Sequence, residues 1–295
     1  MVNTTGDRDL QSIPRKLPMW TVGVKSLPDH ICIYSLDRST LIFSCSSSGV
    51  ISLLTYVSPV TYDSPRYIRS FHLFPQQTHL AIQSFLVFNH FIFLHLQDKH
   101  QNGLIYLFSH AGALECAPIE LSHPVHQYLA DENRLWAINS VTHSVYYHAQ
   151  PTSTHEIDSV FSNIEEFISF SRQSNFLPIR MSINQQSLAL LSQDRQQVFI
   201  YNKQTRERIF TSHFSAGDRM NVCDIGLFPR ENSLLLKFNL LSHSTAKRSL
   251  FIHFDTKNQS VGKIEEQNCL GVAIGPNKEI LMGFNLRAGI IRCCM

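Results

Sequence analysis

Fifteen histidines and seven cysteines are the side chains of this chain that could bind a metal or carry acid–base chemistry. His123 and His126 form the closest histidine pair, but Pro124 between them breaks any helix that would align the two rings. His90 and His95 are five residues apart, so on one straight strand they face opposite sides. Zinc sites need closely spaced ligand pairs, and neither H-E-x-x-H nor C-x-x-C occurs. We therefore expect no bound metal and no cofactor.

The cysteines are odd in number and lie mostly within apolar runs. Free cysteine in such positions behaves as a small hydrophobic residue. We expect reduced thiols, because no secretory signal accompanies them. Cys293 and Cys294 are adjacent in an expected strand, so they should point to opposite faces of its sheet. The cysteines are Cys32, Cys45, Cys116, Cys223, Cys269, Cys293 and Cys294.

A repeated pattern indicates which elements must position these residues. An apolar strand, a polar turn, a second strand, another turn and a third strand follow one another in two close copies, Pro178 to Tyr201 and Gly271 to Cys293. Looser copies bring the number to six, and they recur at about 40 to 50 residues, the period of four-stranded propeller blades. The second strands begin at Leu41, Phe93, Leu135, Leu188, Leu234 and Ile280. The sequence thus predicts an all-β fold, a β-propeller of six four-stranded blades.

The outermost strand of each blade is the weakest part of the pattern. The sixth copy lacks one, whereas Trp20 to Val24 has the composition of a strand and precedes the first copy. We predict that this N-terminal strand pairs with Ile290 to Cys294 and closes the ring, which removes an open sheet edge. The domain prediction is a flexible N-terminal segment over residues 1–16 and a single propeller over 17–295. Candidates for the other outer strands are Ile68 to Leu73, Ala117 to Leu121, Arg208 to Phe214 and Ser260 to Ile264.

One stretch departs from the strand rhythm. Between the third and fourth copies, apolar residues recur at three and four positions, as on one face of a helix. Asp158 and Ser159 could cap the start of such a helix. The alternatives are that Phe167 to Ser171 is the outer strand of blade three, or that a helical turn precedes a strand. The apolar residues are Ile157, Val160, Phe161, Ile164, Phe167 and Ile168.

The middle strands of a propeller are packed between neighbouring blades, so their side chains should be buried on both faces. We expect burial of Leu135, Trp136, Leu188, Leu190, Leu234, Leu236, Ile280 and Met282.

Three polar residues lie at or near the places where a propeller channel would present acids and amides to a metal: Asp131, Asn184 and Asp224. Turn formation and capping explain them as well. Phosphate-binding loops and the G-x-S-x-G serine elbow are missing from the sequence. The expectation is therefore no catalytic residue, with a hydrolase or lactonase that holds a divalent metal in the channel as the alternative.

The composition argues against partners that bind mainly by charge, such as nucleic acid or an anionic membrane. Charged residues make up 16% of the chain, well below the usual quarter, and the net charge is +2. The most apolar run, Phe85 to Leu96, is shorter than the about 20 residues of a spanning helix. The first residues lack the apolar core of a signal peptide. We expect a cytoplasmic, monomeric propeller with no membrane insertion.

At the sixth copy the sequence resembles a known family. Leu270 to Phe284, LGVAIGPNKEILMGF, is similar to the core of an NHL repeat, and Asp131 to His148 is similar to the second and third strands of that repeat. WD-type propellers are the rival, but their Gly-His and Trp-Asp signatures are missing. The resemblance implies six blades and a platform that binds proteins or RNA.

The function that we expect is a non-enzymatic interaction scaffold that binds a protein partner through loops on one face. Stretches Gln97 to Gly103 and Leu241 to Ser249 break the repeat spacing and are interpreted as insertions, so they are the expected contact loops. An RNA-binding NHL-type propeller is a further alternative, because Arg66, Tyr67 and Arg69 with other small basic clusters could contact phosphates. The remaining clusters are Arg206 with Arg208 and Lys247 with Arg248. The residues expected to contact the protein partner are Gln97, Asp98, Lys99, His100, Lys247 and Arg248.

Overall fold

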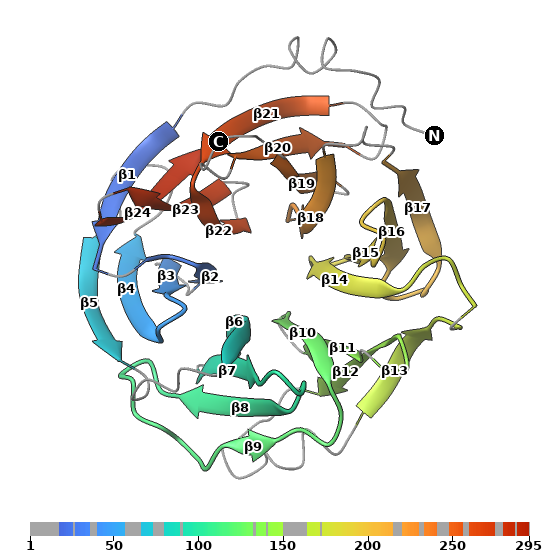
Figure 1. The fold of residues 1–295 in the computed structure, drawn as a ribbon, viewed down its shortest axis with the longest axis horizontal. Coiled ribbons are helices and arrows are strands. Elements are labelled where there is room, and N and C mark those ends of the chain that lie inside the picture. Colours follow the sequence, from blue (N-terminus) through green and yellow to red (C-terminus); the bar gives the residue numbers. More distant parts are fainter. Residues whose placement is uncertain are drawn as a thin grey trace.

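Twenty-four strands in the described residues form six four-stranded antiparallel sheets, as seen in the computed structural model of the chain. The structure describes residues 18–25, 27–35, 40–56, 66–72, 80–88, 91–131, 134–139, 141–149, 164–171, 173–214, 220–229, 233–240, 248–255, 260–274, 280–286 and 288–294. Each sheet is one blade, and the blades surround a central axis with their first strands innermost (Figure 1). The expected fold class, a six-bladed β-propeller, is confirmed.

The blades follow one another along the chain. Blade one contains β2 (His30–Ser35), β3 (Thr40–Cys45), β4 (Val50–Tyr56) and β5 (Arg66–His72). Blade two contains β6 (Ala81–Phe88), β7 (Phe91–Gln97), β8 (Gly103–Phe108) and β9 (Ile119–Glu120). Blade three contains β10 (Val125–Ala130), β11 (Arg134–Asn139), β12 (Ser144–Ala149) and β13 (Ile164–Ser169). Blade four contains β14 (Pro178–Ile183), β15 (Ser187–Ser192), β16 (Gln197–Asn202) and β17 (Arg208–His213). Blade five contains β18 (Met220–Leu227), β19 (Leu234–Leu240), β20 (Arg248–Phe254) and β21 (Ser260–Gln267). Blade six contains β22 (Cys269–Ile274), β23 (Ile280–Leu286) and β24 (Ala288–Cys294).

The fourth strand of blade six comes from the N-terminal part of the chain, as predicted. Strand β1 (Pro18–Val24) pairs antiparallel with β24, and Trp20 lies opposite Cys293 in the register. The strand begins two residues before the predicted Trp20. Because the pairing joins two distant parts of the chain, it closes the ring between blades six and one, where β1 runs beside β24 (Figure 1).

Alternating side chains explain why the second strands are buried on both faces. In β11, Leu135 packs toward blade two whereas Trp136 packs toward blade four. In β15, Leu188 packs toward blade three and Ala189 toward blade five. One hydrophobic cluster lies at each of the six junctions between neighbouring blades. The middle-strand residues predicted to be buried are 0% to 1% exposed, which confirms that prediction: Leu135, Trp136, Leu188, Leu190, Leu234, Leu236, Ile280 and Met282.

The helix expected between blades three and four is wrong over its described part. Strand β13 pairs with β12, and Ile168 lies opposite Val145 in the register. Phe167 is buried against Trp136, with ring centroids 5.3 Å apart, whereas Ile164 is 48% exposed. Sheet pairing and this aromatic contact therefore outweigh the helical spacing. Both alternative interpretations expected an outer strand, and the strand is present, starting three residues before the predicted Phe167. A helical turn ahead of it, with Asp158 and Ser159 as caps, would lie outside the described residues. Ile157, Val160 and Phe161 lie outside the described residues.

The other predicted outer strands are present as β5, β9, β17 and β21, of which β9 is only two residues long. The stretch Gln97 to Gly103 is not a long insertion. It is a five-residue turn between the end of β7 and the start of β8. Asp98 closes this turn by accepting hydrogen bonds from the backbone amides of His100 and Asn102, at 2.7 and 2.8 Å. Within the described part of the chain, no helix is long and apolar enough to cross a membrane.

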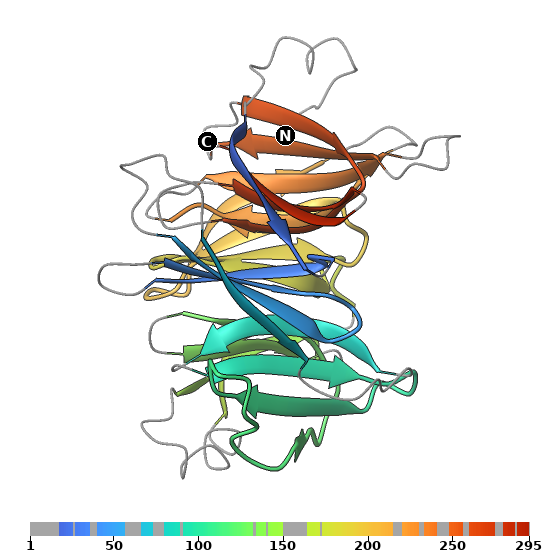
Figure 2. The same ribbon diagram turned by 90° about the vertical axis from the view of Figure 1, so that its left-hand side faces the viewer.

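Antiparallel order gives the propeller two distinct faces, visible in side view (Figure 2). We call the face on which the innermost strands begin the N face, and the face on which they end the C face. Turns between first and second strands, and between third and fourth strands, lie on the C face. Turns between second and third strands lie on the N face. Each loop of the sequence is thereby assigned to one side of the molecule.

Candidate functional site

Asp131 and Asn184 build turns on the C face and tie neighbouring blades together. Oδ1 of Asp131 accepts a hydrogen bond from the backbone amide of Arg134 at 2.8 Å, which closes the turn between β10 and β11. Asn184 does the same between β14 and β15, where its Oδ1 accepts the Ser187 amide at 2.7 Å. Its Nδ2 donates to the carbonyl of Phe228 in blade five at 3.0 Å. The turn-forming interpretation of these two residues is therefore correct.

Asp131 also forms the floor of a polar groove on the C face, between blades three and four. Its Oδ2 accepts hydrogen bonds from Trp136 Nε1 at 2.9 Å and from Lys203 Nζ at 2.8 Å. The Asp131 and Lys203 side chains are 16% and 11% exposed, so this ion pair is largely buried. Arg134 lies with its guanidinium carbon 4.2 Å from the centre of the Tyr147 ring. Charged groups at the floor are thus held rigidly by hydrogen bonds and aromatic faces.

The groove encloses about 550 Å³ and is open to solvent. Exposed glutamines from two different turns lie along it, Gln185 and Gln186 after β14 and Gln204 after β16. Its full lining is Asp131, Arg134, Gln185, Gln186, Asn202, Lys203 and Gln204. Two cations and one carboxylate give this lining a net charge of +1. A rigid charged floor with amide side chains above it can form hydrogen bonds with the backbone of a bound chain.

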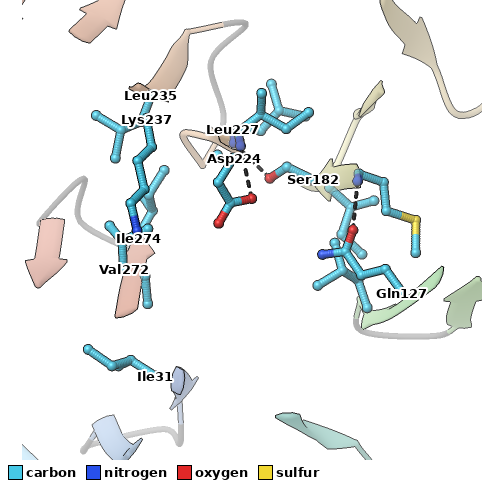
Figure 3. A pocket seen from close by; sticks show the side chains of 15 residues that line it. Ile31, Gln127, Ser182, Asp224, Leu227, Leu235, Lys237, Val272 and Ile274 are labelled. Atoms are coloured by element: carbon cyan, nitrogen blue, oxygen red, sulfur yellow. Dashed lines mark hydrogen bonds between the residues drawn. The ribbon is translucent and has the colours of Figure 1, made fainter. Parts of the chain in front are cut away.

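A second cavity, of about 230 Å³, lies in the central channel (Figure 3). Its walls come from the innermost strands of blades one, three, four, five and six, and from β19. Most of its lining is apolar, and four side chains bring polar atoms to it: Gln127, Ser182, Asp224 and Lys237. The apolar lining includes Ile31, Leu129, Ile183, Leu235, Val272 and Ile274.

Two of the four polar side chains connect blades. The Oε1 atom of Gln127 accepts the backbone amide of Met181 at 2.7 Å, from blade four. The hydroxyl of Ser182 accepts the backbone amide of Leu227 at 2.8 Å, from blade five. Gln127 therefore keeps its amide nitrogen, and Ser182 its hydroxyl hydrogen, as donors toward the channel.

Asp224 and Lys237 are the charged groups of this cavity, and they lie opposite one another in the register of β18 and β19. Lys237 Nζ donates to the carbonyl of Leu270 in blade six at 3.2 Å. Oδ1 of Asp224 accepts the Ile225 amide at 3.0 Å. Of the three polar residues assigned to the channel from the sequence, only Asp224 lines it.

Two histidines near the N-face mouth of the channel, His30 and His126, have lowered pKa values. Burial lowers the pKa of His30, Asp29 and Asp224 act against this effect, and Arg180 adds to it. Burial also lowers the pKa of His126, again with Arg180 acting in the same direction. The positively charged Arg180 of blade four therefore acts on His30 of blade one and on His126 of blade three. Among the residues that the structure describes, no group of three or more His, Cys, Asp or Glu side chains is close enough to hold a metal ion.

The residues expected to contact a protein partner are not brought together. Gln97, Asp98, Lys99 and His100 lie at the N-face turn between β7 and β8 of blade two. Arg248 begins β20 of blade five, also at the N face, and Lys247 lies outside the described residues. Blades two and five are on opposite sides of the ring (Figure 1). Any partner that contacts both sets must span the channel mouth.

Three arginines of the basic clusters, Arg69, Arg206 and Arg208, are engaged within the protein. Arg69 on β5 donates through Nη2 to the carbonyl of His110. Arg206 forms a 2.6 Å ion pair with Glu165, and Arg208 lies 4.7 Å from the centre of the Phe199 ring. These contacts leave Arg206 paired and Arg208 stacked rather than arranged along a phosphate-binding track.

The cysteines are free thiols, and burial makes several of them poor nucleophiles. Burial raises the pKa of Cys45 to about 12, that of Cys223 to about 11 and that of Cys269 to about 12. Cys293 packs at the junction of blades six and one, whereas Cys294 packs at the junction of blades five and six. The prediction that these two neighbours point to opposite faces is confirmed.

Gln127, Ser182 and Lys237 were not singled out from the sequence. Single polar residues in strands carry no motif, so the only available indication was a polar side chain inside an otherwise apolar run. Lys237 in the run LLLKFNL is such a residue.

No protein-family model and no curated protein sequence matches this chain. Solved structures match it by fold. They include Raptor from Chaetomium thermophilum, with 10% identity and a TM-score of 0.53 over 96% of this chain and 30% of that one. The C-terminal WD40 domain of Sif2 matches with 8% identity and a TM-score of 0.55, over 96% of this chain and 99% of the domain. A candidate 6-phosphogluconolactonase from Bacteroides uniformis matches with 10% identity and a TM-score of 0.53, over 87% of this chain and 78% of that one. Identities this low show a shared propeller fold and nothing finer.

Proposed function

We propose that this chain is a non-enzymatic interaction scaffold that binds a protein partner through the C face of its propeller. The observation that carries the proposal is the groove between blades three and four, about 550 Å³ in volume. Its floor is a buried ion pair between Asp131 and Lys203, so the surface is formed before a partner arrives. Preformed sites lose less conformational entropy on binding than flexible loops do.

The chemistry of the lining favours an extended, acidic segment of the partner. Gln185, Gln186 and Gln204 carry amides that can donate to and accept from a peptide backbone. Arg134 and Lys203 against Asp131 leave one excess positive charge, which favours a carboxylate in the bound segment. The competing surface is that of the contact residues inferred from the sequence, of which Gln97 to His100 and Arg248 lie on the N face.

An interaction role agrees with propeller neighbours such as the WD40 domain of Sif2, although that likeness concerns the fold. As expected from the sequence, we also propose that the chain is an NHL-like propeller and that it is located in the cytoplasm. The alternative of a metal-dependent hydrolase would require several oxygen ligands in the channel. The channel cavity offers one carboxylate, that of Asp224, and we therefore favour binding over catalysis. RNA is the less favoured partner, because Arg69, Arg206 and Arg208 are engaged with protein groups.

Matched substitutions distinguish partner binding at the C face from partner binding at the N face. A C-face variant, Gln186→Glu with Gln204→Glu, adds negative charge beside the groove without touching the Asp131–Lys203 pair. An N-face variant, Lys99→Gln with His100→Glu, changes the charge by the same −2 at the β7–β8 turn. Quantitative affinity capture from cells that express each full-length protein is the measurement, with mass-spectrometric comparison of recovered proteins.

We expect the C-face variant to lose a specific partner by about tenfold or more and the N-face variant to retain it. Loss from the N-face variant alone would move the site to the loops inferred from the sequence. Equal recovery of every protein by all three forms would overturn the scaffold proposal, as would lactone hydrolysis by the purified chain that chelation abolishes.

A further inference from the structure

The cavity in the central channel contains a pair of opposite charges that do not neutralise each other. Asp224 and Lys237 face one another in adjacent strands, so their side chains leave the sheet on the same side. Among the described residues they form no ion pair, because Lys237 Nζ reaches across to the carbonyl of Leu270 in the next blade at 3.2 Å. Asp224 instead turns its carboxylate into the open centre of the cavity (Figure 3).

The cavity combines several hydrogen-bond donors with one anionic acceptor. The acceptor atoms of Gln127 and Ser182 are occupied by the backbone amides of Met181 and Leu227, at 2.7 and 2.8 Å. Each oxygen keeps a second lone pair, and both side chains also retain donors, the N–H of Gln127 and the O–H of Ser182. Together with the Lys237 ammonium, the cavity therefore presents three donor groups, and its single anionic acceptor is Asp224.

A carboxylate in partly apolar surroundings is costly unless a cation or donor satisfies it. Asp224 is only partly exposed, and the groups that surround the cavity are mainly aliphatic side chains of neighbouring blades. Mg²⁺ and Ca²⁺ are a poor match, since they take six or more oxygen ligands and the side-chain oxygens of the cavity come only from Asp224, Ser182 and Gln127 among the described residues. A ligand ammonium, with three donors of its own, fits one carboxylate well.

Size restricts the ligand further. A volume of about 230 Å³ lies below the range of pockets for drug-sized molecules. At about 30 Å³ for one water-sized group, it holds about eight such groups. Ile31, Leu129, Ile183 and Ile274 line the remaining wall with branched or aliphatic carbon.

We propose that this cavity binds a small aliphatic α-amino acid as a zwitterion. Its ammonium pairs with Asp224, its carboxylate accepts from Lys237 and from the donors of Gln127 or Ser182, and its side chain packs against the aliphatic wall. The site shares no lining residue with the proposed partner groove, which lies on the C face at the turns that follow β10, β14 and β16.

The test uses the full-length protein and isothermal titration calorimetry with L-alanine, L-valine and L-leucine. Two matched probes each lack one charge of valine: isobutylamine lacks the carboxylate, and 3-methylbutanoate lacks the ammonium. We expect at least one of the amino acids to bind saturably below about 10 mM. We expect each probe to bind about tenfold or more weakly than valine, because each lacks one charge-assisted hydrogen bond.

Single substitutions test the contributions of Asp224 and Lys237 to ligand affinity separately. Asp224→Asn should lower valine affinity toward that of 3-methylbutanoate, while the affinity for 3-methylbutanoate changes little. Lys237→Met should lower valine affinity toward that of isobutylamine. Lys263→Met and Glu207→Gln, outside the cavity, are the matched controls and should bind as the unaltered protein does. Thermal melting of each variant verifies that it is folded, and the probe comparison on the unaltered protein decides the question if a variant is not.

Three results would overturn the proposal: no saturable binding of any of the three amino acids, equal binding of valine and isobutylamine, or unchanged valine affinity in Asp224→Asn. Preferential binding of D-glucose, offered as a polyol that also complements one carboxylate and several donors, would assign the cavity to a different ligand class.

Discussion

The backbone amide of Tyr128 donates a buried hydrogen bond of 2.7 Å to the hydroxyl of Ser84 and so joins the innermost strands of blades three and two. The same arrangement recurs at the next junction, where Gln127 accepts the Met181 amide, and again where Ser182 accepts the Leu227 amide. Blades two to five are therefore connected near the channel by side-chain acceptors as well as by the hydrophobic clusters between them.

We predict that Ser84→Ala lowers the free energy of unfolding by about 1–3 kcal/mol, because the buried Tyr128 amide loses its acceptor. Chemical denaturation followed by circular dichroism measures the change. Ser169→Ala, on the exposed outer strand of blade three, is the matched control and should change stability by less than about 0.5 kcal/mol. A loss no larger than that of the control would mean that the hydrogen bond contributes nothing.

Stability should fall as the solution is acidified, because His95 is completely buried and its ring lies edge-on against Tyr128. Burial lowers its pKa from 6.5 to about 4. Between these values the unfolded chain binds a proton that the folded chain rejects, so stability present above pH 6.5 is lost as the pH falls toward 4. A pKa difference of this size between the unfolded and the folded chain corresponds to about 3 kcal/mol in the free energy of unfolding. Burial lowers the pKa values of His30, His123 and His126 as well, which acts in the same direction.

Urea unfolding at pH 7.5, 5.5 and 4.5 measures this dependence. His95→Phe removes the titrating group while keeping an aromatic ring, so its free energy of unfolding should decline less steeply over the same interval. Parallel curves for the two proteins would show that His95 is not the source.

Removal of residues 1–25 should destabilise the propeller, because it deletes β1 and exposes the edge of β24. Removal of residues 1–16 alone should leave stability unchanged, as expected for a segment that precedes the domain. Thermal melting and light scattering compare the two truncated proteins with the full chain. Equal melting temperatures for the full chain and the 1–25 deletion would refute the role of β1 in closure.

Leu188→Ala should lower the free energy of unfolding by about 2–5 kcal/mol, since Leu188 is fully buried on the second strand of blade four. It packs in the cluster that includes Trp136 and Met181, so truncation leaves a cavity between two blades. Denaturation experiments with the variant test this value. A loss below about 1 kcal/mol would show that the neighbouring side chains fill the space.

The repeat period was sufficient to predict the blades, their second strands and the closing strand, because each of these depends on apolar residues at regular spacing. The channel was not predictable in the same way. In blades two to five, the innermost strand has a register shift near its beginning, for example between Ile82 and Ser84 and between Val222 and Asp224. Each shift changes which side chains share a face of the strand, so counting by twos along the sequence does not indicate which polar groups line the channel. Lys237 illustrates the difficulty, because its role depends on the register that places it opposite Asp224.

Glycines at the junction of blades six and one permit close backbone contact and give the last prediction. A Cβ atom on Gly283 would lie 2.4 Å from the carbonyl oxygen of Pro28, and one on Gly271 would lie 2.7 Å from that of Asp29. These neighbours are backbone atoms of the segment that leads into β2, so they cannot move aside by a rotamer change. Gly283→Ala should therefore lower the free energy of unfolding by about 1–3 kcal/mol through overpacking.

Gly23→Ala is the matched control, because a Cβ atom there would have no heavy atom within 4 Å and Gly23 lies in a strand. Alanine restricts the unfolded chain more than glycine does, so this variant should be neutral or more stable by about 0.4–1 kcal/mol. Thermal and chemical denaturation of the two variants side by side measures the contrast. If Gly283→Ala proved as stable as Gly23→Ala, the tight packing of blade six against the Pro28–Asp29 backbone would be disproved.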